Sequence, residues 1–321
     1  MPAPRPFLQA EIPAALQAAR SRGPRWARWL DSVPRLATTL LAEWSLTRDG
    51  PPRHGHTALV LPVRATTGHS LVLKLTPPGR PGIDDGAGEI PALKAWAGRG
   101  AVRLDRADPR RGALLLERLG DEDVATLWDH EAAEAVGRLY RRLHVPAPPT
   151  VPSLAPFVLR WLDRLEELGR DVPAPPRFVA QALRSGRDLA ADGTAAVLHG
   201  DLHYANVLRG RDEEWLAIDP KGFAGDPCFE PAPMLWNRWD DLTSAGDLGH
   251  AIRYRFWGLI DAGELDERRC RDWVVVRAMV NVAWEVDDAR RAGTDLSAAS
   301  RAWITRCVTV AKAMQAVGGG W

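Results

Sequence analysis

Near the start of the chain, apolar residues recur at the spacing of a helix. Further along, their spacing becomes that of short strands. Between residues 11 and 42 they follow one another at steps of three and four, which is typical of an amphipathic helix: Leu16, Ala19, Trp26, Trp29, Leu30 and Leu36. The pattern next predicts one short helix over residues 89–97 and five strands, over 44–47, 57–63, 71–75, 102–104 and 113–116. This mixture indicates a small β-rich unit.

The remainder of the chain is patterned mainly as helices. Helical periodicity predicts six of them, over about residues 122–144, 155–170, 176–191, 247–262, 268–290 and 297–316. Two short apolar strands are expected among them, at residues 196–198 and 215–218. We therefore expect an α+β fold with two lobes. Residues 1–118 would form an N-terminal helix and a small β-rich lobe, and residues 119–321 a larger, mostly helical lobe.

Composition and charge narrow the class of protein. The 42 Lys and Arg residues nearly balance the 41 Asp and Glu residues, whereas nucleic-acid-binding proteins usually carry a basic excess. The three cysteines are far apart, which indicates free thiols in a reducing compartment. No apolar run reaches the roughly 18 residues that span a bilayer, and the first residues lack a signal-peptide pattern. We expect a cytoplasmic protein that binds neither nucleic acid nor membranes. Its oligomeric state is not indicated.

The strongest chemical signal is the segment HGDLHYAN at residues 199–206, followed by Asp219. Asn206 lies five residues after Asp201, and Asp219 thirteen residues after Asn206. Phosphoryl transfer needs these groups in this order. One carboxylate, here Asp201, accepts the proton of the attacking hydroxyl, while an amide oxygen and a second carboxylate hold Mg²⁺. The catalytic loop of protein kinases has the same Asp-to-Asn spacing. Gly200 replaces its arginine here, and Pro-Lys rather than Phe-Gly follows Asp219, which points to a kinase of small molecules.

Two other interpretations of this segment stay open. Gly, Asp and Asn are common turn residues, so each residue alone fits simple turn chemistry. The pattern His199-x-Asp201-x-His203 also resembles the zinc ligands of a hydrolase, but that interpretation leaves Asn206 and Asp219 unexplained and lacks an obvious further ligand. We expect His199 to support the loop backbone by hydrogen bonding, and His203 to do the same or to contact the substrate.

A single cation inside an apolar strand is the second signal. Lys74 lies in the run LVLKLT at residues 71–76, where strand alternation places it on a partly apolar face. In kinases a lysine on the third strand binds the α- and β-phosphates of ATP and pairs with a glutamate on the next helix. Glu89 is the best partner, because it lies on the apolar stripe of the predicted helix and needs a cation there. Asp84 and Asp85 are competing partners, and a surface lysine is the alternative.

The segments expected to contact the nucleotide carry weaker signals. Protein kinases cover the phosphates with a G-x-G-x-x-G loop, but residues 50–57 here contain two glycines without that spacing. The P-loop motif G-x-x-x-x-G-K-[ST] does not occur, which argues against a P-loop kinase. Glu117 and Leu119 bracket a strand-like connector that would present backbone groups to adenine. An ordinary strand end has the same pattern.

With these residues identified, the chain resembles the aminoglycoside phosphotransferase families, which share the protein-kinase-like fold. Within them it is similar to the streptomycin 6-phosphotransferase and hydroxyurea phosphotransferase group. The similarity runs from about residue 45 to 240. The segments that carry it are residues 73–75, 89–96, 100–104, 114–119, 198–208, 215–222 and 225–227.

The resemblance implies a role for each matching residue. It would make Asp201 the catalytic base, Asn206 and Asp219 the Mg²⁺ ligands, Lys74 the ligand of the ATP phosphates, Glu89 its orienting partner, and Glu117 to Leu119 the adenine connector. Lys221 would lie near phosphate or substrate. Glu230 stands where relatives commonly have Asp. It keeps the charge with a longer reach, which leaves its role open.

The resemblance also implies ATP and Mg²⁺ as cofactors and a small hydroxyl-bearing acceptor. A cationic aminoglycoside such as streptomycin is the leading expectation, as in antibiotic resistance, and such a substrate favours carboxylates around it. The candidates in the helical lobe are Asp240, Glu285 and Asp288, which lie near Trp239 and Trp284 in the sequence. The same acids fit a solvated helix face. The alternatives are hydroxyurea, an amino sugar or another metabolite as acceptor, and a nucleotide-binding pseudokinase that acts through protein contacts.

Overall fold

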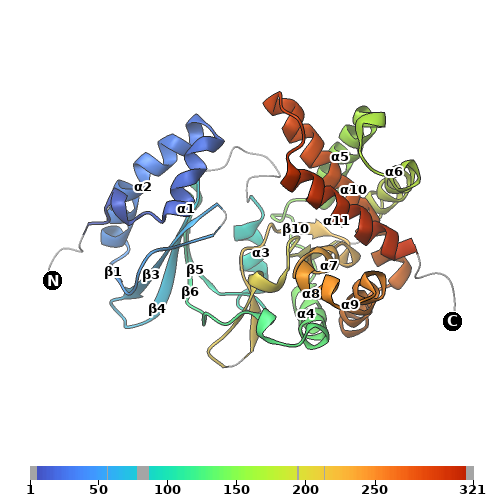
Figure 1. The fold of residues 1–321 in the computed structure, drawn as a ribbon. Coiled ribbons are helices and arrows are strands. Elements are labelled where there is room, and N and C mark those ends of the chain that lie inside the picture. The colour runs from blue at the N-terminus through green and yellow to red at the C-terminus, as the bar shows by residue number, and fades with distance from the viewer. Residues whose placement is uncertain (1–5, 56, 78–86, 194, 213, 316–321) are drawn as a thin grey trace. The chain divides into compact units, whose positions relative to one another are not determined.

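The computed structural model describes residues 6–55, 57–77, 87–193, 195–212 and 214–315. The chain divides into two compact units, Met1–Gly120 and Asp121–Trp321. The first unit contains a β-sheet covered by helices, and the second is mostly helical (Figure 1). This arrangement confirms the α+β class predicted from the sequence.

The N-terminal helical region is divided rather than continuous. It consists of the short helices η1 (Gln9–Glu11), α1 (Ala14–Gln17) and η2 (Ala18–Arg22), followed by the long helix α2 (Pro24–Glu43). Gly23 separates them with a φ of +124°, a backbone conformation that favours glycine. Pro24 then begins α2, where its missing N–H costs no helical hydrogen bond. The sequence periodicity did not reveal this break, because the apolar spacing continues across it.

The sheet of the first unit is antiparallel, with strand order β1-β3-β4-β6-β5 and β2 paired to β3. The strands are β1 (Leu46–Arg48), β2 (Arg53–His54), β3 (Leu59–Ala65), β4 (Ser70–Leu75), β5 (Leu104–Asp108) and β6 (Ala113–Glu117), and helix α3 (Glu89–Trp96) lies between β4 and β5 in the sequence. Two sequence predictions were incomplete. The short strand β2 was missed, and β5 begins where the predicted strand 102–104 ends.

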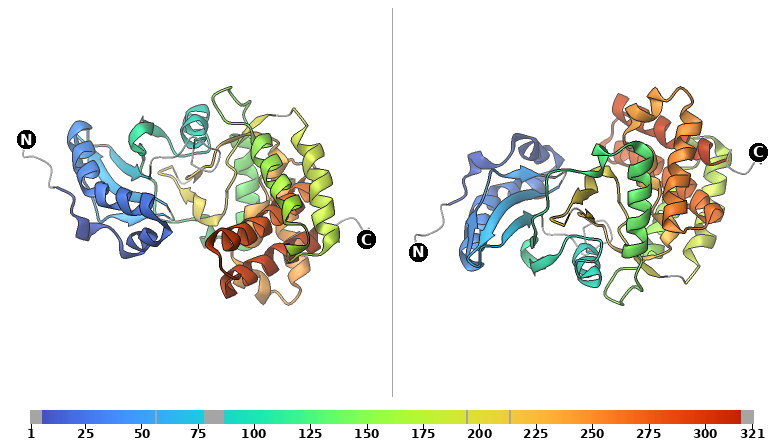
Figure 2. Two further views of the ribbon diagram at one scale, coloured as in Figure 1. Left: turned by 90° about the horizontal axis from the view of Figure 1, so that it is seen from above. Right: turned by 90° about the horizontal axis from the view of Figure 1, so that it is seen from below.

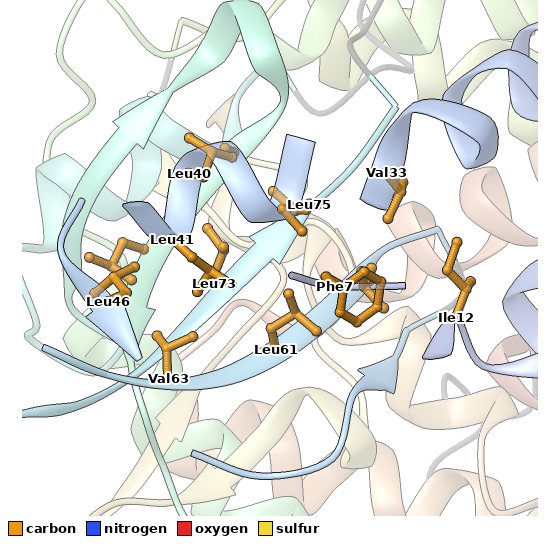
Figure 3. Packing of buried hydrophobic residues seen from close by; sticks show 14 of the residues in the cluster. Phe7, Ile12, Val33, Leu40, Leu41, Leu46, Leu61, Val63, Leu73 and Leu75 are labelled. Carbon is orange, nitrogen blue, oxygen red and sulfur yellow. The ribbon is translucent and has the colours of Figure 1, made fainter. Parts of the chain in front are cut away.

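The core of this unit lies between α2 and one face of the sheet (Figure 3). Leu73 and Leu75 of β4 point into this core and are fully buried. Because successive side chains of a strand alternate between its faces, Lys74 lies on the opposite face of the sheet from these two leucines. The packing against α2 therefore fixes which face of β4 carries the lysine.

The second unit combines eight α-helices and two short antiparallel strand pairs within its described residues. Its helices are α4 (Asp129–Leu143), α5 (Leu154–Leu168), α6 (Pro176–Ala190), α7 (Ala232–Trp236), α8 (Trp239–Ser244), α9 (Leu248–Gly263), α10 (Glu267–Ala292) and α11 (Ala298–Gln315). The strand pairs are β7 (Ala196–Leu198) with β10 (Phe223–Gly225), and β8 (Val207–Arg209) with β9 (Trp215–Ala217). Helix α10 packs against α5, α6 and α11 (Figure 2).

The six long helices expected from periodicity are present, with one shifted start. Helix α4 begins at Asp129 rather than near residue 122, because Asp123 caps a separate 3₁₀ turn over Val124–Thr126. The elements that the sequence did not predict are β8, β10, α7 and α8. Each is three to six residues long, which is too short for a periodic pattern to register.

Candidate active site

The loop that carries Asp201 begins with a turn that only glycine fits. Gly200 follows β7 with a φ of +82°, and a Cβ atom there would lie 3.0 Å from the ring of Phe223. Phe223 belongs to β10, the partner strand of β7. The close approach of Phe223 therefore leaves little room for a side chain at position 200, where protein kinases have arginine. Asp201 follows as a half-buried residue.

Two charged residues, the fully buried Glu230 and the half-buried Arg277, hold the backbone before Asp201. The carboxylate of Glu230 accepts the backbone N–H groups of His199, at 2.5 Å, and of Gly200, at 3.2 Å. The guanidinium of Arg277 on α10 donates to the Gly200 carbonyl at 2.8 Å. Burial raises the pKa of Glu230 to about 7, while the positive charge of Arg277 opposes that rise. Glu230 therefore has the hydrogen-bonding role that the sequence left open.

His199 joins this loop to the strand end before Asp219. Its Nε2 lies 2.8 Å from the carbonyl of Ile218, and its Nδ1 accepts the backbone N–H of Asp201 at 3.2 Å. This pattern places the proton on Nε2, and burial lowers the pKa of the fully buried ring to about 4. The prediction that His199 supports the loop backbone is confirmed.

The zinc-hydrolase interpretation is not supported by this geometry. Both ring nitrogens of His199 are engaged by the backbone, so neither is available as a metal ligand. Within the part of the chain that the structure describes, no group of three or more His, Cys, Asp and Glu side chains is placed to hold a metal ion.

Asn206 and Asp219 lie on adjoining segments beside Asp201. The amide nitrogen of Asn206 donates to the Asp201 carbonyl at 2.9 Å, which turns its Oδ1 away from that carbonyl. The backbone N–H of Ile218 donates to the Asn206 carbonyl at 2.9 Å, and Asp219 follows with a φ of +57°. Amide and carboxylate oxygens are the ligands that Mg²⁺ prefers, so this donor set fits the ion.

Two further predicted residues also lie at this site. The ammonium group of Lys221 is 3.7 Å from Asp201 Oδ2, and its backbone N–H donates to the His199 carbonyl at 2.8 Å. The Nε2 atom of His203 lies 3.2 Å from the amide nitrogen of Asn206. The structure therefore brings Asp201, Asn206, His203 and Lys221 together, with Asp219 next to the segment bonded to Asn206.

The first unit contains the expected ion pair between Lys74 and Glu89. Lys74 Nζ lies 2.6 Å from Glu89 Oε1, and both residues are buried, at 7% and 8% exposure. A buried lysine and glutamate need each other's charge, which rules out the alternative of a surface lysine. Asp84 and Asp85, the competing partners, lie outside the described residues.

The two segments expected to contact the nucleotide have ordinary secondary structure. Part of the loop at residues 50–57 forms β2, whose residues pair with β3. Glu117 is the last residue of β6. Its backbone N–H donates to the Arg103 carbonyl at 2.9 Å, and Leu119 follows the strand as a half-buried residue. Their proposed contacts with ATP stay a prediction.

The candidate acceptor residues differ in their surroundings. Asp240 on α8 and Asp288 on α10 are exposed, whereas Glu285 on α10 is half-buried. Asp287, between the last two, is fully buried and accepts from Arg164 Nε at 2.6 Å, so it is a structural residue. The acidic run on α10 thus contains both surface and core carboxylates.

A second network of largely buried residues links the loop after Asp201 to the segment before Asp240. Asp129 accepts the Tyr204 hydroxyl at 2.5 Å and Arg255 Nε at 2.9 Å. The fully buried Arg255 also donates to the carbonyl of Asn237 at 2.7 Å. Sequence reasoning missed this network. It also missed Arg277, although Arg277 interrupts the apolar run at residues 274–280 just as Lys74 interrupts its strand.

Comparison with known proteins defines the class of fold first. A solved structure of spectinomycin phosphotransferase in complex with AMP superposes with a TM-score of 0.57 at 14% identity, covering 89% of this chain and 98% of that chain. The protein therefore has the kinase-like fold of the aminoglycoside phosphotransferases.

Sequence comparison then gives the family. The model described as aminoglycoside/hydroxyurea antibiotic resistance kinase matches residues 43–289, and the chain belongs to this family of phosphotransferases. It is 38% identical to streptomycin 6-kinase of Streptomyces glaucescens, covering 88% of this chain and 93% of that one. It is also 38% identical to hydroxyurea phosphotransferase of Kitasatospora aureofaciens, covering 87% and 81%. Every helix in the described ranges is too short or too polar to cross a membrane.

The shifted pKa values of three titratable groups near the loop let us predict how the free energy of unfolding changes with pH. Burial lowers the pKa of His144 and of His199 from 6.5 to about 4, and burial raises that of Glu230 from 4.5 to about 7. Near pH 5 the unfolded chain would bind almost two histidine protons while the folded chain binds about one, at Glu230. This difference shrinks towards pH 6.5, where each unfolded histidine is half-protonated. From these groups, stability should therefore fall with decreasing pH, by about 1.4 kcal/mol per unit near pH 5.

Urea unfolding at several pH values tests this expectation. His144→Phe keeps a ring against Tyr140, whose centroid is 5.6 Å from that of His144, and removes one titrating group. Near pH 5 its slope should therefore be about one proton smaller than that of the wild type. Equal slopes in the two proteins would show that His144 is not held as a buried neutral ring.

Proposed function

We propose that this protein phosphorylates a hydroxyl group of a streptomycin-like aminoglycoside, with ATP and Mg²⁺ as cofactors. Membership of the family and the names of the relatives support the reaction and the acceptor. The observation that carries the proposal is the arrangement of Asp201, with its backbone fixed, beside Asn206 and Lys221. Phosphoryl transfer depends mainly on positioning and charge neutralisation, and this arrangement supplies both.

In this proposal Asp201 accepts the proton of the attacking hydroxyl. Asn206 and Asp219 would hold the metal, and Mg²⁺, when bound, neutralises charge on the phosphates. Lys221, 3.7 Å from Asp201 Oδ2, places a positive charge where the acceptor oxygen and the transferred phosphoryl group would meet. His203 lies against Asn206 and would contact the acceptor or the metal ligand.

The first unit would bind the nucleotide through Lys74. Its ion pair with Glu89 fixes the ammonium group at the buried face of β4 opposite α2. Glu117 to Leu119 would present backbone groups to adenine. The AMP-bound structure of the spectinomycin phosphotransferase supports the use of an adenine nucleotide.

The acceptor would be recognised by the face of α10 that carries Glu285 and Asp288, together with Asp240. Glu285 lies eight residues after Arg277, which corresponds to about 12 Å along the helix. Carboxylates at this distance from the catalytic loop suit an extended cationic acceptor rather than a small neutral one. Hydroxyurea is the second candidate, supported by the name of the relative from Kitasatospora aureofaciens. The retained set of Asp201, Asn206 and Asp219 counts against a pseudokinase.

The base assignment is tested by Asp201→Asn. The variant keeps the shape of the side chain but cannot accept a proton, so kcat should fall by at least about 100-fold while ATP affinity changes little. Product formation with streptomycin is followed by mass spectrometry and ATP binding by calorimetry. Asp201→Asn with wild-type turnover would remove Asp201 from the mechanism.

The nucleotide role of the first unit is tested by Lys74→Met. Loss of the ammonium group should raise KM for ATP by about tenfold or more, because the phosphates lose a charge-assisted contact. Lys94→Met on the exposed side of α3 is the matched control and should behave as the wild type. If both variants show unchanged ATP kinetics, the phosphate-binding role of Lys74 is wrong.

Acceptor recognition is tested by a double substitution, Glu285→Gln with Asp288→Asn. KM for streptomycin, which carries two guanidinium groups, should rise by about tenfold, whereas KM for neutral hydroxyurea should not change. Asp295→Asn, an exposed acid beyond the end of α10, serves as the control. An equal effect on both acceptors, or on neither, would contradict the proposed role of this face.

A further inference from the structure

Arg277 is a single cation in an apolar stretch of α10. Residues 274–276 and 278–280 on either side are Val-Val-Val and Ala-Met-Val, and all six are buried. The guanidinium carbon of Arg277 lies 4.1 Å from the centroid of the Phe229 ring and 5.7 Å from that of Trp236. A cation placed among apolar side chains and aromatic rings has lost much of its hydration, so its remaining contacts must compensate for that loss.

Those contacts are made to two particular peptide groups. Arg277 Nη2 donates to the Gly200 carbonyl at 2.8 Å, and Nη1 donates to the Phe229 carbonyl at 2.9 Å. The first carbonyl belongs to the peptide bond that precedes Asp201, and the second to the one that precedes Glu230. One rigid guanidinium therefore sets the separation between the loop that carries Asp201 and the segment that carries its carboxylate anchor.

The peptide plane between Gly200 and Asp201 is fixed at both ends. Its carbonyl accepts from Arg277, and its N–H donates to His199 Nδ1 at 3.2 Å. The preceding N–H, that of Gly200, donates to Glu230. Rotation of this plane would break a charge-assisted hydrogen bond on one side and a buried hydrogen bond on the other, so the direction of the Asp201 side chain follows from these contacts.

The acidic groups around Arg277 favour its protonated, positively charged form. The titratable groups that interact with it are Asp201, Glu230 and Tyr140. Burial lowers the pKa of Arg277, whereas the two carboxylates raise it, and an arginine stays protonated in either case. The guanidinium thus remains a permanent positive charge between the two acids.

We propose that Arg277 is a positioning residue for the phosphotransfer reaction. By holding the Gly200 carbonyl, it fixes the carboxylate of Asp201 in the orientation that accepts the hydroxyl proton, without contacting the substrate itself. The inference rests on the proposed function of Asp201. It adds a residue of α10 to those that support catalysis, although the sequence motif around Asp201 gives no indication that this helix takes part.

Three variants test the proposal through turnover. Arg277→Met removes the charge and both donors while keeping an unbranched side chain, and Arg277→Lys keeps the charge but has a single nitrogen in place of the fork. A misplaced base should lower kcat by about 100-fold in Arg277→Met and by about tenfold in Arg277→Lys, with KM for ATP and acceptor within about twofold. Arg271→Met, another arginine of α10, which pairs with Glu267 at 4.0 Å, is the matched control and should keep wild-type kcat.

Hydrogen–deuterium exchange gives a readout that does not depend on the acceptor. In Arg277→Met the amides of residues 199–201 should exchange at least about tenfold faster, while those of the β8–β9 pair keep their wild-type rates. Arg277→Lys, which retains the charge, should show an intermediate rate. If Arg277→Met does not fold, the same two measurements on Arg277→Lys decide.

The outcomes separate this inference from the proposed function. Faster exchange together with lower kcat at constant KM supports the positioning role. Wild-type kcat, unchanged exchange, a loss confined to KM, or an equal loss in Arg271→Met overturns it. If Asp201→Asn keeps its activity, or the wild type phosphorylates no acceptor in a panel, the proposed function fails. In that case the hydrogen–deuterium exchange rates of residues 199–201 are the remaining test of whether Arg277 fixes the loop.

Discussion

The position of Asp201 depends on how the two backbone amides before it are satisfied. Buried N–H groups must be hydrogen-bonded, and the sharp turn at Gly200 removes His199 and Gly200 from any regular strand ladder. Glu230 supplies one carboxylate for both N–H groups. A buried carboxylate is costly unless it is hydrogen-bonded and near a positive charge, and Arg277 provides that charge. The loop that carries Asp201, the segment around Glu230 and helix α10 are therefore interdependent.

The length of the Glu230 side chain fits this arrangement. An aspartate at this position would end one methylene earlier and need a closer approach of its backbone to the loop. Here the segment at Glu230 is also held by Tyr140, whose hydroxyl donates to the Glu230 carbonyl at 3.3 Å, and by Arg277 through Phe229. The glutamate side chain spans the remaining distance to the N–H groups of His199 and Gly200.

The sequence predicted those features whose chemistry is local. Each of these features can be recognised within a short stretch of sequence. They are the spacing of Asp201, Asn206 and Asp219, the single lysine in β4 and the long amphipathic helices. The contacts of Arg277 with Gly200 and Phe229, and of Arg255 with Asp129 and Asn237, join segments 18 to 126 residues apart, and no local pattern encodes them. Short elements such as β2, α7 and α8 were missed for a related reason, since their formation depends on tertiary packing rather than periodicity.

Under the proposed function, helix α10 would carry both a residue that positions the base and residues that recognise the acceptor. Near the middle of α10, Arg277 donates to the carbonyl of Gly200 in the loop that carries Asp201. Near the C-terminal end of the helix, the buried Asp287 accepts a hydrogen bond from Arg164 of α5. Substitution of Arg277 would leave the buried Glu230 without that positive charge, and substitution of Asp287 would remove the partner of Arg164. The exposed Asp288 and the half-buried Glu285 lie within two residues of Asp287 in the sequence but can change without that cost. A rigid helix with replaceable surface acids would let members of the family change their acceptor while the base keeps its geometry.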